Sequence, residues 1–233
     1  MSSSSNPEIF TDVTIDPFVR GWLHRPASPN GAALVLTHGA GGNCNSPLVI
    51  ALAETFSQAG FTVLRCDLPF RQDRPYGPPG PGDNKRDRAG LQSALQAVKK
   101  QCSGKIFLGG HSYGGRQASI LCAELSAANP GKASESAGLL LLSYPLHPPR
   151  KPEQLRTQHF FNLQTPALFV EGTQDPFGTI AEIEQALKLI PAKTRLLRVE
   201  GAGHDLGFKG KAKRQELPEK VLQEFQAFFP ARS

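Results

Sequence analysis

The stretch Leu-Gly-Gly-His-Ser-Tyr-Gly-Gly, residues 108–115, places a serine between two glycines at Gly-x-Ser-x-Gly spacing. This pentapeptide is typical of a sharp turn from a strand into a helix, in which the serine is held in strained backbone geometry. The residues two positions away must then be small, as Gly110 and Gly114 are. Because so short a pattern also arises by chance, the surrounding sequence must separate a nucleophile at Ser112 from a plain glycine-rich turn.

The sequence on both sides of Ser112 predicts the elements that such a turn requires. Residues 105–108 have the character of a buried strand, and an apolar stripe at helical spacing follows the glycines. Five further runs are also predicted as strands, and most are apolar throughout, as expected of strands covered on both faces. These runs are residues 32–37, 61–66, 139–142, 167–170 and 194–199.

Helical segments separate the strands. One begins at Ser46-Pro47 and ends at Gly60, and an amphipathic segment near residues 221–229 closes the chain. The alternation predicts an α/β fold with a mostly parallel sheet covered by helices on both faces. We expect an antiparallel pair within residues 8–24 at the sheet edge, a disordered tail at residues 1–7, and a single domain over residues 8–233.

Two connections have no clear periodicity. Residues 69–84 are rich in proline and glycine and are predicted to form a loop instead of a helix or strand. Residues 144–165 join two strands and are too few to hold a large helical cap. We expect an open site with these two segments as its walls.

A serine nucleophile needs a base and an orienting carboxylate. His204 follows the last predicted strand on a glycine-flanked loop, from which an imidazole can reach Ser112; His147, also after a strand, is its competitor. Asp175 follows the strand 167–170 and is the preferred acid. Asp205 would have to fold back onto its own neighbour, and Asp67 is better placed as a loop anchor.

The glycine-rich residues 37–43 (Thr-His-Gly-Ala-Gly-Gly-Asn) follow the first parallel strand. There the backbone N–H of Ala40 can join that of Tyr113 in facing an oxyanion. A phosphate-binding loop is the weaker interpretation, because no lysine follows the glycines in the required spacing. Unrelated folds that carry a Ser-His-Asp triad differ in the chain order of its members, and the order Ser112, Asp175, His204 matches a single one of these folds.

Composition limits the partners and the compartment. The net charge is +6, but the densest basic run, Lys209, Lys211, Lys213 and Arg214, is short and lacks interleaved aromatics, so we expect no nucleic-acid partner. No apolar run is long enough for a membrane span. The first residues lack the features of a secretion leader, and the four cysteines show no metal-binding spacing. We expect a cytoplasmic protein with free thiols, no metal and no cofactor, as a monomer or a dimer.

The segments His-Gly-Ala-Gly-Gly-Asn, Gly-His-Ser-Tyr-Gly-Gly-Arg, Ser-Tyr-Pro-Leu-His-Pro-Pro and Phe-Val-Glu-Gly-Thr-Gln-Asp-Pro-Phe-Gly resemble the α/β-hydrolase superfamily. More narrowly, they resemble its small, lidless, dienelactone-hydrolase-like family, whose domain also occurs in testis-expressed proteins and in a subunit of a vertebrate histone-acetyltransferase complex. The resemblance implies an eight-stranded sheet and a serine-hydrolase triad on Ser112, Asp175 and His204. True dienelactone hydrolases use a cysteine where this chain has Ser112.

The sequence therefore predicts a serine hydrolase that acts on a small-molecule ester, thioester or related acyl bond. A peptidase or amidase with the same residues is one alternative, and a catalytically silent hydrolase-fold scaffold is another. Four cations in or beside the 69–84 segment suggest an anionic substrate: Arg71, Arg74, Lys85 and Arg86. The candidate substrate-binding residues are His111, Arg71, Tyr144, His147 and Phe177.

Overall fold

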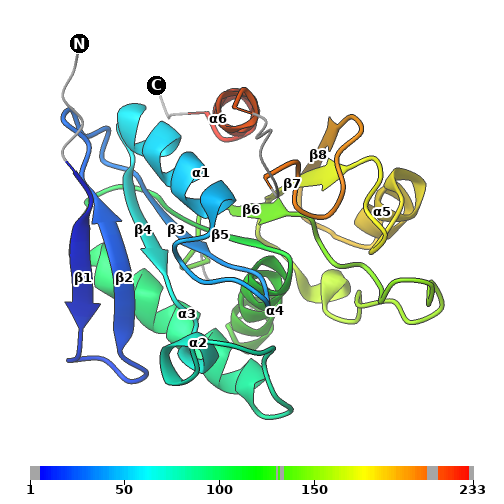
Figure 1. Ribbon diagram of the computed structural model, residues 1–233, viewed down its shortest axis with the longest axis horizontal. Coiled ribbons are helices and arrows are strands. Elements are labelled where there is room, and N and C mark those ends of the chain that lie inside the picture. The colour runs from blue at the N-terminus through cyan, green and yellow to red at the C-terminus, as the bar shows by residue number, and fades with distance from the viewer. Residues whose placement is uncertain (1–5, 130, 132–133, 209–214, 231–233) are drawn as a thin grey trace.

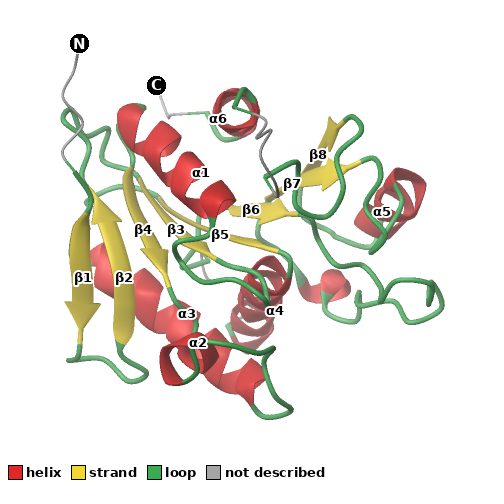
Figure 2. Ribbon diagram, in the orientation of Figure 1, coloured by secondary structure: helices red, strands yellow, loops and turns green. Residues whose placement is uncertain are grey.

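The computed structural model describes residues 6–129, 131, 134–208 and 215–230, in which one eight-stranded sheet carries helices on both faces (Figures 1 and 2). The strand order is β1-β2-β4-β3-β5-β6-β7-β8. β1 (Glu8–Asp12) and β2 (Val19–His24) form an antiparallel pair at one edge, and β2 is also antiparallel to β4. All other pairs are parallel, which confirms the predicted fold class and the antiparallel edge.

The parallel strands lie close to the predicted positions. They are β3 (Ala33–Thr37), β4 (Thr62–Cys66), β5 (Ile106–His111), β6 (Leu139–Leu142), β7 (Ala167–Gly172) and β8 (Thr194–Val199). The helices are α1 (Pro47–Gln58), α2 (Pro69–Asp73), α3 (Asp83–Lys99), α4 (Tyr113–Ala128), α5 (Ile180–Leu187) and α6 (Leu217–Phe228).

The two faces of the sheet have separate apolar cores. On β3, Leu34 and Leu36 pack into the core on the side of α1 and α6, whereas Ala33 and Val35 pack into the core under α3 and α4. All four side chains are buried. Successive strand residues point to opposite faces, so a strand covered twice must be apolar at every position. This packing explains the unbroken apolar runs in the sequence.

The proline-rich connection differs from the prediction of a loop over residues 69–84. α2 occupies its first part, and α3 begins at Asp83. Pro69 stands at the first helical position, where a missing N–H costs nothing, and the Asp87 carboxylate accepts the N–H of Phe70 at 3.0 Å. Proline therefore starts a short helix here, and only residues 74–82 remain irregular.

The segment between β6 and β7 holds only a short 3-10 helix, Phe160–Asn162, so the prediction that no large cap is present is confirmed. The described helices include none that is both long and apolar enough to cross a membrane. Residues 1–5 of the predicted tail lie outside the described residues, and so does the basic run Lys209, Lys211, Lys213 and Arg214.

Candidate active site

Ser112 lies on the turn between β5 and α4, with φ of 51° and ψ of −116°. Few residues other than glycine adopt a positive φ, and here the Ser112 N–H is fixed by the carbonyl of Leu142 at 2.8 Å. A Cβ on Gly110 would lie 2.6 Å from the nitrogen of Gly115, and one on Gly114 would lie 2.5 Å from the carbonyl oxygen of His38. Both glycines are thus required by close backbone contacts.

A chain of hydrogen bonds joins Ser112 to His204 and Asp175. The Nε2 atom of His204 is 2.8 Å from the Ser112 Oγ, and its Nδ1 atom is 2.8 Å from the Asp175 Oδ2. Because an ionised carboxylate only accepts hydrogen bonds, Nδ1 carries the imidazole proton and Nε2 accepts the serine hydroxyl. The sequence-predicted residues are therefore brought together, in the arrangement that a nucleophile, its base and an orienting acid require.

The buried Asp175 carboxylate is held by its own loop, and the His204 ring is packed on two sides. The second oxygen of Asp175 accepts the N–H of Phe177 at 2.8 Å. The Phe177 ring stacks on the imidazole with centroids 4.1 Å apart and an angle of 29° between the planes. His111 donates from Nε2 to the carbonyl of His204 at 2.8 Å, and burial lowers the pKa of His111 to about 4, so it is neutral at physiological pH. These contacts fix the position and tilt of the imidazole.

The glycine-rich loop after β3 lies directly against the serine. A Cβ built on Gly39 would be 3.4 Å from the Cβ of Ser112. No described residue accepts a hydrogen bond from the N–H of Ala40. Tyr113 is the first residue of α4, and its N–H has no acceptor within the helix. Among the described residues, neither N–H group is therefore engaged by a hydrogen-bond acceptor.

His38 supports this loop from below and was not among the predicted residues. Its Nδ1 lies 2.8 Å from the carbonyl oxygen of Gly39, and its Nε2 lies 3.1 Å from the N–H of Leu68. A carbonyl only accepts and an amide only donates, so the ring is neutral and carries its proton on Nδ1. Burial also lowers the pKa of His38. Asp67 accepts the N–H of Cys44 at 2.8 Å, which confirms its prediction as a loop anchor.

A cavity of about 720 Å³ opens in front of Ser112. The glycine loop forms one side, the start of α1 the next, and residues 204–208 the third. Of the five predicted substrate-binding residues, His111 and Phe177 line it. The other lining residues, apart from Ser112 itself, are Gly39, Ala40, Gly41, Gly42, Ser46, Pro47, Leu48, His204, Asp205 and Phe208.

Tyr144 and His147 are buried away from this cavity. Tyr144 is 1% exposed and donates its hydroxyl to the carbonyl of Arg156 at 2.8 Å. His147 lies with its Nδ1 2.8 Å from the Pro148 carbonyl oxygen and its Nε2 3.4 Å from a carboxylate oxygen of Glu182 on α5. Residues 143–147 are therefore buried in the interior where a wall of the site was expected, and His147 does not compete with His204 for Ser112.

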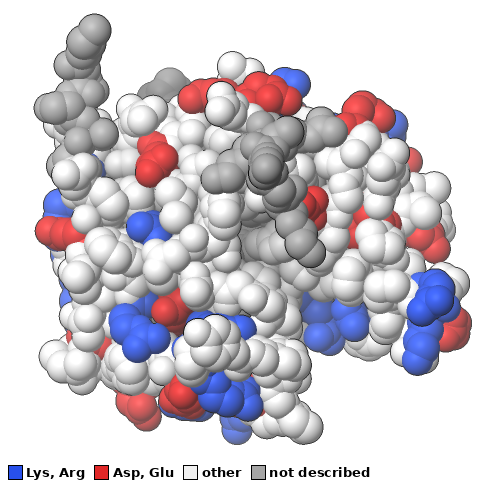
Figure 3. Space-filling model, in the orientation of Figure 1, with Lys and Arg blue, Asp and Glu red and all other residues white. Residues whose placement is uncertain are grey.

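The three arginines in and beside residues 69–84 also differ from the expectation. Figure 3 shows charges of both signs over α2 and α3, where Arg74 pairs with Asp83 and Arg86 pairs with Asp73. Arg71 is buried and donates to backbone carbonyl groups. The described residues that line the cavity include none from residues 69–84. The arginines are satisfied within the protein, which removes the basis for expecting an anionic substrate from them.

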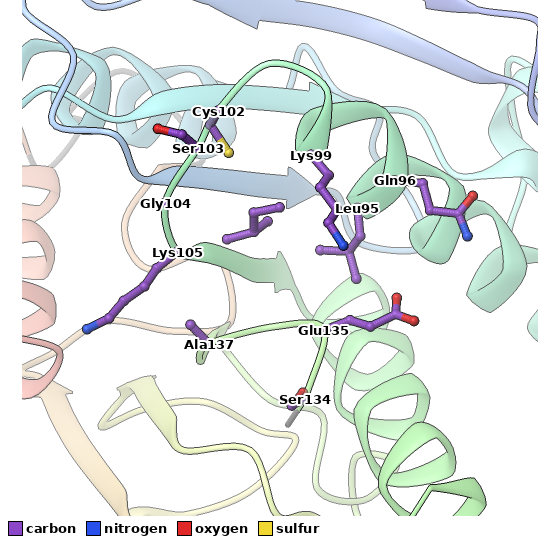
Figure 4. A pocket seen from close by; sticks show the side chains of 11 residues that line it. Leu95, Gln96, Lys99, Cys102, Ser103, Gly104, Lys105, Ser134, Glu135 and Ala137 are labelled. Carbon is purple, nitrogen blue, oxygen red and sulfur yellow. The ribbon is translucent and has the colours of Figure 1, made fainter. Parts of the chain in front are cut away.

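A second cavity of about 560 Å³ lies at the opposite end of β5 from Ser112 (Figure 4). Lys99 on α3, Glu135 before β6 and Cys102 are among the residues that line it. Lys105 lines it too and donates to the carbonyl of Pro230 at 3.2 Å. Within the described part of the chain, no cluster of three or more His, Cys, Asp or Glu side chains is placed to hold a metal ion.

The chain is similar to one protein family and to solved structures. A family model described as an alpha/beta hydrolase domain matches residues 30–229. A lidless α/β serine hydrolase from Xanthomonas campestris superposes with a TM-score of 0.71 at 16% identity, covering 99% of each chain. A dienelactone hydrolase from Anabaena variabilis gives 0.69 at 21% identity, with 97% of this chain and 98% of that one covered. An α/β serine hydrolase homologue from Coxiella burnetii gives 0.69 at 18% identity, covering 96% and 99%.

Proposed function

The chain belongs to the alpha/beta hydrolase family, and on that premise we propose that it is a serine hydrolase that cleaves an ester, thioester or related acyl bond. The observation that carries the proposal is the unbroken hydrogen-bond chain from Asp175 through His204 to Ser112. The strained backbone at Ser112 adds to it, because such strain is concentrated at functional sites.

In the proposed reaction, the Ser112 Oγ attacks the acyl carbon while its proton passes to Nε2 of His204. Asp175 keeps the imidazole in the correct tautomer and stabilises the imidazolium. The N–H groups of Ala40 and Tyr113 donate to the oxyanion, and the latter lies at the positive end of the α4 dipole. Collapse of the intermediate releases the leaving group, which takes the proton from His204. Water, deprotonated by the same imidazole, then hydrolyses the acyl-enzyme.

The cavity supports an acyl substrate. Leu48, Phe177 and Phe208 give it apolar surface beside the polar glycine loop. A mostly apolar pocket with a few convergent polar groups is typical of small-molecule sites. Without a large cap, a leaving group can extend into solvent from the carboxyl ends of the strands.

The direct test is labelling with a fluorophosphonate, which phosphonylates an activated serine. We expect the wild type to be labelled and the Ser112→Ala and His204→Ala variants to be unlabelled. Ser103→Ala, at an exposed serine, is the matched control and should label like the wild type. A folded wild type that resists labelling would contradict the nucleophile and favour a scaffold role.

The bond type is tested with matched acyl esters, thioesters and anilides of 4-nitrophenol, 4-nitrothiophenol and 4-nitroaniline. We expect turnover of the ester and the thioester, and turnover of the anilide at a comparable rate would instead indicate an amidase.

Asp175→Asn should lower kcat by roughly 10³- to 10⁴-fold, because an amide at this position favours the wrong imidazole tautomer. A loss below about tenfold would exclude Asp175 as the orienting acid.

A further inference from the structure

The guanidinium of Arg71 lies beneath the glycine loop and is bound by backbone carbonyl groups. Its Nε donates to the carbonyl of Gly42 at 2.8 Å, and its Nη2 donates to that of Ala40 at 2.9 Å. Towards the other side, Nη2 and Nη1 donate to the carbonyls of Gly77 and Arg74 at 2.9 and 3.0 Å. The residue is 4% exposed. Arg71 thus ties the loop after β3 to residues 74–77.

No ion pair formed within the described part of the chain includes Arg71. The four carbonyl groups turn the negative ends of their dipoles toward the guanidinium, but they carry no net charge. Its positive charge is therefore not cancelled by a carboxylate, and it sits one hydrogen bond away from Ala40, the residue that offers an N–H next to Ser112. A fixed charge at that position favours a negative charge that develops on the far side of the loop.

We propose that Arg71 is a positioning residue for acyl transfer: its planar fork fixes the loop that carries the Ala40 N–H, and its charge stabilises the oxyanion through that loop. The proposal rests on the proposed function of the same site. Lysine cannot reproduce the fork, because its ammonium is a point charge on a flexible stem.

The helix that carries Arg71 is itself held in place. The Asp87 carboxylate accepts the N–H of Phe70 at 3.0 Å and the hydroxyl of Tyr113 at 2.6 Å. The rings of Phe70 and Tyr113 meet edge to face with centroids 5.8 Å apart. Tyr113 is the residue whose N–H lies at the start of α4. The buried Asp87 carboxylate therefore contacts both α2, whose Arg71 holds the Ala40 loop, and Tyr113 at the start of α4. A small shift of α2 would move the Ala40 N–H relative to the Tyr113 N–H.

A role in binding an anionic substrate fits the structure less well. Four of the five N–H groups of Arg71 are already engaged by carbonyl groups. A substrate carboxylate would have to displace them and leave buried carbonyls without donors. The two roles differ in what they do to neutral and anionic substrates, and this difference provides the test.

The experiment compares Arg71→Met and Arg71→Lys with the wild type on a neutral ester, 4-nitrophenyl butanoate, and an anionic ester, mono-(4-nitrophenyl) succinate. We expect Arg71→Met to lower kcat on the order of 10- to 100-fold for both esters with KM within about twofold, since it misplaces a transition-state donor. Arg71→Lys should fall between, because it keeps the charge without the fork. Arg86→Met, which removes an exposed arginine nearby, is the control and should stay within about twofold of the wild type.

A rise in KM confined to the anionic ester would overturn the proposal and make Arg71 a substrate ligand, and an unchanged kcat would overturn it outright. If Arg71→Met does not fold, as judged by circular dichroism, Arg71→Lys decides by the same criteria. Fluorophosphonate labelling separates this proposal from the one on which it rests. An unlabelled wild type defeats both, whereas a labelled wild type with Arg71→Met labelled equally fast defeats only the role of Arg71.

Discussion

Glu171 is a buried carboxyl group that the proposed reaction does not use. It lies on β7, four residues before Asp175, and its Oε1 accepts the N–H of Tyr144 at 2.7 Å. Its Oε2 has no hydrogen-bond partner among the described residues. Burial raises the pKa of Glu171 well above its usual range, and the charge of Asp175 adds to the effect. The folded protein therefore holds this proton at pH values where an exposed glutamate has lost it.

We predict that Glu171→Gln removes a pH-dependent loss of stability. Above the unfolded-chain pKa of about 4.3, the unfolded state releases the proton while the folded state keeps it. The wild type thus loses up to about 1.4 kcal/mol of unfolding free energy per pH unit until the folded-state pKa is reached. Urea unfolding at pH 5 and pH 8 should show the variant gaining on the wild type as pH rises. A difference that stays constant between these pH values would contradict the prediction.

The three candidate triad residues could be predicted from the sequence, whereas the burial of side chains such as Tyr144 could not. Ser112, Asp175 and His204 each follow a strand in a fixed chain order, and these are local features of the sequence. Whether Tyr144 points inward or into a cavity depends on neighbours far along the chain, such as Phe169, which its ring contacts. Burial of this kind has no local signature in residue type.

α5 is the helix whose start is best defined by side chains. Thr179 accepts the N–H of Glu182, and the Glu182 carboxylate accepts the N–H of Thr179 at 2.8 Å, which together form a capping box. So short a helix has little stability of its own and depends on such contacts. α5 buries its own Ile183 and Ala186 in the core, and none of its residues is among the described residues that line the site cavity.

We predict that Thr179→Ala lowers the free energy of unfolding by about 1 kcal/mol, because it leaves a helical N–H without its acceptor. Thr179→Ser keeps the hydroxyl and should stay within about 0.5 kcal/mol of the wild type. Urea unfolding measures both, and kcat should be unchanged in each. Equal destabilisation by alanine and serine would show that the methyl group, not the cap, carries the effect.

Strands were easier to predict than their ends. β5 continues through Gly109 and Gly110, past the predicted end at Leu108, because glycine is a poor signal for a strand. Here glycine is needed: a Cβ on Gly109 would lie 2.9 Å from the carbonyl oxygen of Leu140 on the adjacent β6. α2 was missed for the opposite reason, since proline was taken to exclude a helix that it in fact begins.

Across the whole molecule, the four cysteines are free thiols, as predicted, and they differ in exposure. Cys44, Cys66 and Cys122 are buried, whereas Cys102 is partly exposed. Burial raises the pKa of both Cys44 and Cys122 to about 12 and that of Cys66 further still. The thiolate form that reacts with alkylating agents is therefore suppressed at these three positions. Burial raises the pKa of the Cys102 thiol as well, but Cys102 is the cysteine that solvent reaches.

We predict that iodoacetamide at pH 8 alkylates the native protein at Cys102 alone and the urea-unfolded protein at all four cysteines. Peptide mass spectrometry reads out both states, and Cys102→Ser should leave the native protein unmodified. Modification of Cys44 before unfolding would mean that the loop beside the candidate site opens in solution.

The strand order sets the distance between the turn of Ser112 and the loop of Asp175. β6 lies between β5 and β7 yet supplies none of the described residues that line the cavity, so the turn of Ser112 and the loop of Asp175 stand two strand spacings apart, roughly 10 Å. The side chains of Ser112 and Asp175 cover part of this backbone separation, and the imidazole of His204 bridges the rest with a hydrogen bond of 2.8 Å at each nitrogen. β6 thus holds β5 and β7 at a fixed separation. The apolar packing that keeps β6 between them therefore also fixes the distance over which His204 must connect Ser112 and Asp175.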